Sequence, residues 1–355
     1  MFPRFTGDLS LKLDSLMLRY SKNPSVSELK VQVTSLDSGL SYSWQSPGSK
    51  STHLIASGTK MFAATVVQRL ADEGKLAISD PVSTHLPSSD FANLNIQDGV
   101  DCSEQITIRD LLSHTSGIAD YYQLKRLPKK GDLSQLSEQD PGWSFEEAID
   151  LARQLPSRFA PNSGKAHYSF TNYQLVGRLI EAVTKQSLGD AFKTRIFEPL
   201  NLSDTSLITK ENLEPFYNAS QVLIGNQKYQ GAKRIASLGA EGSIVSSTQD
   251  TTKFLQHFFT GDLKSTTGRD NLLSNWLPIF PGIRYAAGVM SLGLPRVATR
   301  AKHKGRYLGH SGATGHFMFF DPIDRLTIVG SINQLKPSTN AYRLMASVLR
   351  GINSV

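Results

Sequence analysis

The chain is predicted to be an α+β protein of two interleaved domains, and three observations support this fold class. Strand patterns occur near both ends of the 355-residue sequence, and long helical patterns occupy the part between them. A sheet that takes strands from both ends must be completed by segments distant in the sequence. Hydrophobic residues make up 39% of a chain longer than most single domains, so the chain can bury a sizeable core.

The N-terminal part is predicted to supply a helix, a hairpin and a second helix. Residues 8–20 carry apolar side chains at helical spacing, and residues 29–36 and 40–45 alternate as strands around Asp37-Ser38-Gly39. A nearly continuous apolar stretch over residues 61–67 then begins a helix that continues to residue 73. We expect this buried helix to lie under one face of the sheet that the hairpin begins.

The middle of the chain is predicted to be mainly helical. Helical patterns cover residues 106–113, 145–155, 169–184, 189–200 and 249–259. Residues 120–144 form a long polar stretch with prolines and glycines, and loops of that length are usually functional or mobile. We interpret it as a lid with Tyr121, Tyr122 and Trp143 as candidate substrate contacts, and an ordinary surface loop is an equal alternative. For His114, at a helix end, a structural role is favoured over catalysis.

The last third returns to strands and closes with a helix. Residues 284–292, 316–321 and 326–331 read as strands, the last two joined by Pro322-Ile323-Asp324, and residues 340–349 read as a helix.

Composition excludes several functional classes. The net charge of +7 is scattered, and no zinc-finger spacing or RNA-binding signature is present, so no nucleic-acid partner is expected. A single cysteine, Cys102, excludes an intramolecular disulfide and a cysteine-rich metal site. No apolar run has the length of a membrane span or a signal-peptide core. We therefore expect a soluble protein, cytoplasmic unless an export signal was removed; the sequence does not predict its oligomeric state.

The candidate chemistry begins with Ser57 and Lys60, which form a Ser-x-x-Lys motif at the start of the buried helix. Burying an ammonium group costs free energy unless the group is paired or hydrogen-bonded, so a lysine at this position indicates a specific partner or a function. Ser57 is the candidate nucleophile, and a desolvated Lys60 with a lowered pKa would accept its proton. A capping serine followed by a solvent-reaching lysine is the alternative. A second copy, Ser27 to Lys30, precedes a strand and is interpreted as chance.

Acyl chemistry also needs a proton shuttle and donors for an oxyanion. Tyr168 is the candidate shuttle, because an ammonium nearby would lower the pKa of its phenol; a plain core tyrosine is the alternative. Residues 309–315 place glycines around a polar triplet at the edge of a strand. The N–H groups of Ala313 and Ser57 are the candidate oxyanion hole, with His310 facing the cavity.

These motifs, in this order, resemble the serine β-lactamase and penicillin-binding-protein family, most closely the branch with class C β-lactamases, DD-peptidases and family VIII esterases. The resemblance rests on residues 55–60, 76–81, 108–117, 168–177, 241–250 and 309–315.

The resemblance implies an antiparallel sheet flanked by N- and C-terminal helices, an all-helical second domain, and a site in the groove between them. We expect residues 1–75 and 283–355 in the sheet domain and residues 76–282 in the helical one. It also implies a covalent acyl-enzyme on Ser57, proton transfer by Lys60 and Tyr168, and substrate contacts from His310, Ser311 and Gly312. No metal or organic cofactor is implied, because every reacting group belongs to the protein.

The sequence departs from the family at one position that bears on function. The usual Tyr-x-Asn reads Tyr168-Ser169-Phe170, and phenylalanine does not hold the amide that the asparagine normally binds. Asn172 is a candidate partial replacement. Losing a buried amide partner disfavours amide substrates by about 1–3 kcal/mol. Both Phe170 and Asn172 are therefore expected to contact substrate, and ester hydrolysis is favoured.

Three functions are weighed. The first is a carboxylesterase-type serine hydrolase acting on small or medium acyl esters. The second is a DD-carboxypeptidase or D-amino-acid amidase with weak β-lactamase activity, for which the basic residues 296–306 would attract a substrate carboxylate unless they are only a solvated connection. The third is a non-catalytic sensor or scaffold that keeps its acyl group.

Overall fold

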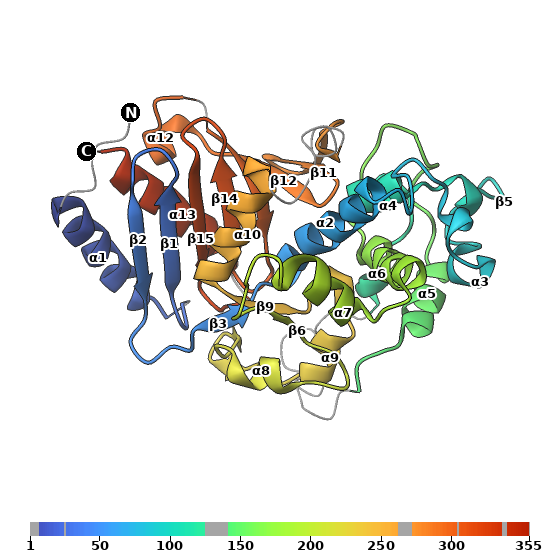
Figure 1. The fold of residues 1–355 in the computed structure, drawn as a ribbon, viewed down its shortest axis with the longest axis horizontal. Helices are drawn as coiled ribbons and strands as arrows, with labels where there is room; N and C mark the ends of the chain where they lie inside the picture. The colour runs from blue at the N-terminus through green and yellow to red at the C-terminus, as the bar shows by residue number, and fades with distance from the viewer. Residues whose placement is uncertain are drawn as a thin grey trace.

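An antiparallel sheet forms one half of the molecule, as a computed structural model shows (Figure 1). The structure describes residues 7–24, 26–124, 141–261, 272–303, 305–335 and 339–354. Within these residues eight strands pair in the order β10-β11-β12-β13-β14-β15-β1-β2. The strands are β1 (Lys30–Ser35), β2 (Ser41–Gln45), β10 (Leu277–Phe280), β11 (Ile283–Ala286), β12 (Val289–Gly293), β13 (Arg306–Ser311), β14 (Phe317–Asp321) and β15 (Leu326–Ser331). The predicted α+β class is confirmed.

The N-terminal hairpin joins the sheet beside its last strand in the sequence. β1 pairs antiparallel with β15, from Lys30 opposite Ser331 to Ser35 opposite Leu326, and with β2 on its other side. Segments about 300 residues apart in the chain therefore lie next to each other, as the strand patterns at both ends predicted.

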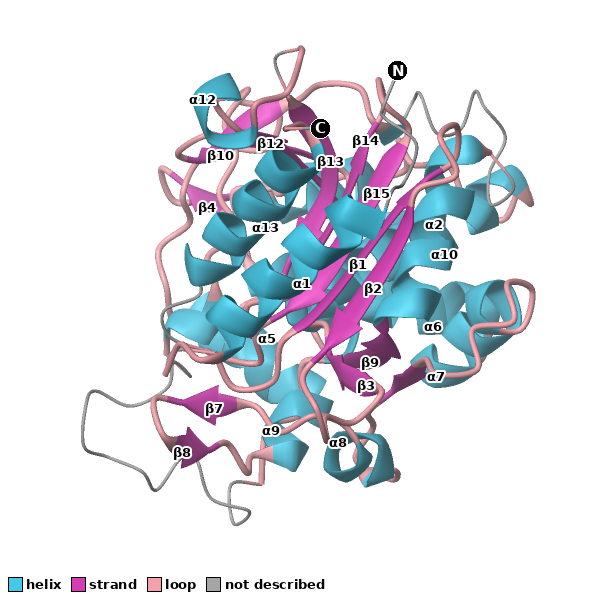
Figure 2. Ribbon diagram, turned by 90° about the vertical axis from the view of Figure 1, so that its left-hand side faces the viewer, coloured by secondary structure: helices cyan, strands magenta, loops and turns pink. Residues whose placement is uncertain are grey.

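Helices cover both faces of the sheet. α1 (Gly7–Ser21) and α13 (Thr339–Ile352) lie across one face (Figure 2), and α10 (Thr248–Thr260) packs on the other against β14, β15 and β1. β14 divides its side chains between these layers. Phe317 and Phe319 belong to the core under α1 and α13, whereas Met318 and Phe320 belong to the core on the α10 side.

The helix that carries Ser-x-x-Lys is not under the sheet, so that expectation was wrong. α2 (Thr59–Asp72) packs against α6 (Phe170–Thr184) and α7 (Leu188–Phe192) in the helical half of the molecule. Residues 59–68 are buried without exception, and a helix buried all round needs neighbours on every side. One face of a sheet does not provide that, and α10 occupies the face instead.

The helical half contains shorter elements. Its α-helices are α3 (Ser88–Phe91), α4 (Ile108–Ser113), α5 (Phe145–Arg153), α8 (Glu214–Asn218) and α9 (Ala232–Ala236), and the predicted helix over residues 189–200 is split into α7 and a π-helical turn (Lys193–Phe197). A small sheet, β3 (Thr52–Leu54), β9 (Ile244–Ser247) and β6 (Ser206–Leu207), leads into α2. β4 (Ile96–Gln97) pairs with β5 (Val100–Asp101), and β7 (Leu223–Ile224) with β8 (Gln227–Lys228). α12 (Arg296–Thr299) precedes β13.

Two expectations stay predictions. One is the lid, because its residues 125–140 lie outside the described residues. The other is the position of the domain boundaries.

None of the described helices combines the length and the apolar character that crossing a bilayer requires.

The strand predicted over residues 284–292 is a hairpin, because Ala287 and Gly288 form a tight turn with φ angles of 36° and 86°. The Gly288 N–H donates to the carbonyl of Leu112 at 3.0 Å, which ties this turn to α4. A Cβ at Gly288 would lie 2.6 Å from Cβ of Ala64 and 3.1 Å from the carbonyl oxygen of Lys60. The sheet hairpin thus packs directly on α2.

We predict that Gly288→Ala lowers the free energy of unfolding by about 2–4 kcal/mol, because the methyl group overpacks the contact with α2 and the turn needs a positive φ. Gly282→Ala is the matched control, since Gly282 has a φ of 75° and open space around it. Urea unfolding of both variants provides the measurement. Equal losses in the two variants would contradict the close packing.

Candidate active site

Ser57 lies at the point where the small sheet passes into α2. β3 ends at Leu54, a single 3-10 turn spans Ala56–Gly58, and α2 begins at Thr59. Ala56 has a φ of 47°, a left-handed conformation that alanine adopts only at an energetic cost. This sharp turn places Ser57, with 9% of its surface exposed, on the wall of an open pocket.

Lys60 lies one helical turn further on and is completely buried. Its Nζ is 3.5 Å from Ser57 Oγ and donates to the carbonyl oxygen of Glu241 at 2.7 Å. The same nitrogen lies 4.4 Å from the ring centroid of Phe170 and 5.1 Å from that of Tyr168. Burial lowers the pKa of Lys60 to about 8, which confirms the predicted desolvation. A useful fraction of this amine is therefore neutral near physiological pH.

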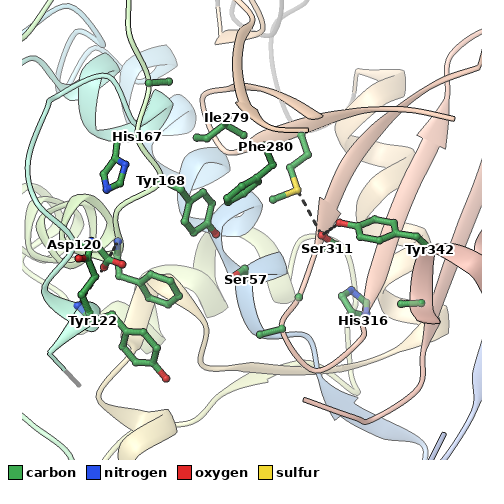
Figure 3. A pocket seen from close by; sticks show the side chains of 17 residues that line it. Ser57, Asp120, Tyr122, His167, Tyr168, Ile279, Phe280, Ser311, His316 and Tyr342 are labelled. Carbon is green, nitrogen blue, oxygen red and sulfur yellow. Dashed lines mark hydrogen bonds between the residues drawn. The ribbon is translucent and has the colours of Figure 1, made fainter. Parts of the chain in front are cut away.

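Tyr168 meets the serine and the lysine from a different part of the chain. Its hydroxyl is directed toward Ser57 (Figure 3), whose side chain acts on it as a hydrogen-bond partner that lowers its pKa. Burial nevertheless raises the pKa of Tyr168 well above its usual range, and the hydrogen bond with Ser57 only opposes this. The expected lowering of this pKa was wrong, because desolvation of the buried phenol is the dominant cause. Tyr168 is therefore a neutral phenol rather than a phenolate.

The end of β13 forms the opposite wall of the pocket. Ser311, Gly312 and Ala313 all line it, and the Ser311 and Tyr342 hydroxyls are 2.6 Å apart (Figure 3). A Cβ at Gly312 would lie 2.4 Å from the carbonyl oxygen of Ile55, so this strand end packs on the backbone that leads into Ser57. The oxyanion hole of Ala313 and Ser57 remains a prediction.

The pocket has a volume of about 480 Å³ and opens to solvent between the sheet and the helical half. Its sheet side is largely apolar, with Ile279, Phe280 and Met290, and its helical side carries Tyr122 and Phe170, whose rings stack at 4.6 Å. Of the lid candidates, Tyr122 lines the pocket. Tyr121 does not, because it is fully buried and donates from its hydroxyl to Glu241 Oε2 at 3.1 Å. Trp143 is buried too and donates to the Tyr121 hydroxyl.

Two further predicted substrate contacts lie away from the pocket. Asn172 is buried on α6, where its amide accepts from Ser116 Oγ at 2.7 Å and contacts His114 Nδ1 at 3.1 Å. His310 does not face the cavity, because side chains alternate along β13 and Ser311 takes the pocket side. The His310 ring is buried, with Nε2 3.3 Å from the Tyr285 hydroxyl. His114 also accepts from the backbone of Ser169, in line with its expected structural role.

The structure adds residues that sequence reasoning missed. His316 lines the pocket and its Nδ1 lies 2.9 Å from Nε2 of the buried His53, while burial lowers the pKa of both rings. Glu241, within a motif already noted, is buried beside Lys60, and burial raises the pKa of its carboxyl well above the usual range. The signal for Glu241 was a carboxylate within an otherwise small and apolar stretch.

The second Ser-x-x-Lys copy is structural. Lys30 is the first residue of β1 and Ser27 lies in the irregular segment before it, so no helical turn brings the two side chains together as it does for Ser57 and Lys60. The Lys30 ammonium donates to Ser220 Oγ and to Glu28 Oε2 instead.

One group of described side chains has the ligand types of a metal site. His303, Asp321 and Asp324 bring their ligand atoms within 4.8 Å of one another at the turn between β14 and β15. Nε2 of His303 already lies 2.9 Å from Asp324 and 3.5 Å from Asp321, and none of the three residues lines the pocket. The basic residues 296, 300 and 306 do not line it either.

Known proteins are similar to this chain in sequence and in fold. The family described as Beta-lactamase matches residues 31–350. A protein of Escherichia coli (strain K12) described as "Putative D-alanyl-D-alanine carboxypeptidase" is 26% identical over 305 residues, which are 78% of this chain and 67% of the relative.

Two solved structures illustrate the likeness of fold. The D-amino acid amidase from Ochrobactrum anthropi SV3 in complex with D-phenylalanine superposes with a TM-score of 0.80 at 20% identity, over 98% of this chain and 99% of that one. EstCE1, a hydrolase with promiscuous acyltransferase activity, superposes with a TM-score of 0.74 at 18% identity, over 96% and 98% of the two chains. At such low sequence identity, these superpositions establish a common fold and no more.

We predict that the buried charge of Lys60 makes the free energy of unfolding depend on pH. The unfolded chain binds the lysine proton up to about pH 10.5 and the folded chain only up to about pH 8, so this contribution to stability rises across that window. The stability of Lys60→Met relative to wild type should therefore fall by about 2–3 kcal/mol between pH 7 and pH 10. Urea unfolding of both proteins across this range, with the exposed Lys165→Met as control, is the measurement. A constant difference would show that Lys60 is not desolvated.

Proposed function

Because the chain belongs to the beta-lactamase family and is a serine hydrolase of the β-lactamase and penicillin-binding-protein superfamily, we propose that it hydrolyses carboxylic esters through an acyl-enzyme on Ser57. The observation that carries the choice of ester is Phe170. Its ring lines the pocket, stacks on Tyr122 and lies 4.4 Å from the Lys60 ammonium. The position where the family holds a substrate amide is thus occupied by an apolar surface.

Acylation begins when Ser57 Oγ attacks the ester carbonyl carbon and gives its proton to the neutral amine of Lys60, 3.5 Å away. At pH 7 about a tenth of a lysine with a pKa of about 8 is neutral. The tetrahedral intermediate then breaks its carbon–oxygen bond to the leaving alkoxide. The neutral phenol of Tyr168 donates a proton to that alkoxide and regains one from the Lys60 ammonium.

Deacylation repeats these steps with water in place of the alcohol. A water molecule in the open pocket loses its proton to the Lys60–Tyr168 pair and attacks the acyl carbon. The bond to Ser57 Oγ breaks, and the proton returns to the serine as the carboxylic acid forms. The N–H groups of Ser57 and Ala313 would stabilise the oxyanion in both steps.

The placement of the other polar side chains supports an ester over an amide or peptide. The amide of Asn172 is engaged by Ser116 and His114, so it does not replace the missing asparagine. The apolar side chains of Ile279, Phe280 and Met290 form the facing wall. A peptide substrate would end in a carboxylate that basic side chains could bind. The basic residues 296, 300 and 306 do not line the pocket.

The D-amino-acid amidase or DD-carboxypeptidase is the second candidate, and the names of the similar proteins favour it. A panel of p-nitrophenyl esters, D-amino amides, a D-alanyl-D-alanine peptide and a chromogenic cephalosporin separates the two. Turnover of the D-amino amides or release of D-alanine above the rate for esters would decide for the amidase or peptidase.

We predict that Ser57→Ala lowers kcat/KM for p-nitrophenyl butyrate by at least about 10³-fold, since the nucleophile is lost. Ser163→Ala, at an exposed serine, is the control and should retain full activity.

In wild type, kcat/KM should rise about tenfold per pH unit below pH 8 and level off above it, because the reaction needs the unprotonated form of Lys60. A flat profile between pH 6 and pH 9 would exclude Lys60 as the base.

We also predict that Phe170→Asn raises the ratio of amide to ester hydrolysis by about 5- to 100-fold, because an amide partner is worth about 1–3 kcal/mol when buried. Phe170→Leu is the matched control, since it removes the ring without adding a polar group. Initial rates on paired esters and anilides of the same acid give the ratio. The same ratio in both variants would show that residue 170 does not select between the substrates.

A further inference from the structure

A second, smaller cavity lies on the inner side of Ser57. Its volume is about 80 Å³, and it is more enclosed than the open pocket. Ser57, Tyr122, Phe170 and Ala313 line both cavities. The candidate nucleophile therefore stands where an open and an enclosed space meet.

The walls of the enclosed cavity are mainly aliphatic. Leu54, Val222, Ile235 and Leu238 are all at least 90% buried, and Leu335 is half-buried beside them. Thr314, a polar lining residue, donates its hydroxyl to the carbonyl of Leu54 at 2.9 Å. Glu241 accepts from Tyr121, and burial raises the pKa of its carboxyl well above the usual range, which disfavours a charge beside an occupant. An apolar group is what these walls accommodate.

The volume limits the size of that group. A cavity of about 150 Å³ holds a benzene ring, which has six carbon atoms. At the same density a cavity of 80 Å³ holds about three or four carbon atoms.

The order of the reaction steps indicates whether the acyl group or the leaving group of the ester lies in the enclosed cavity. The leaving group must depart while the acyl group stays bonded to Ser57, and water must then approach the same carbon from the side that the leaving group vacated. The open pocket of about 480 Å³ gives room for both movements, whereas the smaller and less open cavity of about 80 Å³ gives less room for either.

We propose that the enclosed cavity is the acyl site and that it selects unbranched apolar acyl groups with about three or four carbons, the alcohol lying in the open pocket. This inference rests on the proposed function and narrows it to esters of short-chain carboxylic acids.

Leu238 sets the depth of the cavity close to the nucleophile. A Cβ at Gly242 would lie 3.2 Å from Leu238 Cδ1 and 3.5 Å from the carbonyl carbon of Ala56, the residue before Ser57. Leu238 thus lies beside Gly242, which is itself close to the backbone turn that holds the serine. Shortening this side chain should lengthen the site, and enlarging it should shorten the site.

The test compares p-nitrophenyl acetate, butyrate, hexanoate and octanoate, which share one leaving group. Wild type should show its highest kcat/KM with butyrate and a value at least tenfold lower with octanoate. Leu238→Ala should move the maximum to hexanoate, and Leu238→Phe should move it to acetate. Leu179→Ala, at a fully buried leucine of α6 that lines neither cavity, is the matched control and should keep the butyrate maximum. If Leu238→Ala does not fold, Leu238→Val and Leu335→Ala make the same comparison.

Two outcomes would overturn the inference. One is an octanoate rate equal to the butyrate rate with no shift in Leu238→Ala. The other is a preference of tenfold or more for methyl D-2-aminobutyrate over methyl butyrate, because these differ only by an ammonium group and an apolar site rejects it.

The failure of the proposed function would look different, since D-amino amides or D-alanyl-D-alanine peptides would then be turned over faster than the esters, or wild type would hydrolyse none of the esters at all. In that case p-nitrophenyl methyl-, butyl- and octylphosphonates test the cavity alone. Ser57 Oγ forms a bond to phosphorus and expels p-nitrophenolate, and intact mass reports the rate. Faster modification by the methyl and butyl compounds supports the acyl site, and equal or faster modification by the octyl compound overturns it.

Discussion

The burial of the Lys60 ammonium is the interaction on which the rest of the site depends. Removing a cation from water is costly, and here the cost is offset by the Glu241 carbonyl at 2.7 Å and by aromatic rings that present their faces to Nζ. These partners come from the turn before β9 and from α6, which explains why α2 is enclosed by helices rather than laid under the sheet. The same enclosure lowers the pKa of the amine to about 8, into the range that the proposed role as a base requires.

The pocket exists because two separately packed cores meet at Ser57. One core lies between the sheet and its outer helices, and the other joins the inner face of the sheet to the helical half. At their boundary the end of β13 lies against the Ile55 carbonyl, so close that Gly312 has no room for a side chain. The strand edge and the nucleophile are consequently held by backbone contact, and such contact places reacting groups more firmly than flexible side chains do.

Sequence reasoning predicted the elements well and the directions of side chains less well. The motif spacing and the apolar helix were enough to predict a desolvated Lys60, because burial follows from the pattern itself. They did not show that Asn172 and His310 point away from the pocket, since a change of one residue in helical phase or strand register reverses a side chain. The sign of the pKa shift of Tyr168 was missed because burial and the nearby acidic groups both raise its pKa, and only the packed structure shows how deeply the phenol is buried. The enclosed cavity could not be predicted either, because its walls come from segments as distant as residues 54, 238 and 335.

The pairing of β1 with β15 has a consequence for how the protein reaches its native state. Lys30 is opposite Ser331, so β1 has no partner on this side until β15, about 300 residues later in the chain, has been synthesised. Closing so long a loop lowers the chain entropy before the contacts between the strands can offset the loss. Topologies dominated by such distant contacts therefore fold slowly. Until that closure the N-terminal hairpin exposes an unpaired edge, which is prone to associate with other chains. Assembly of the sheet once β15 has been synthesised is therefore the step at which this chain is most vulnerable to aggregation.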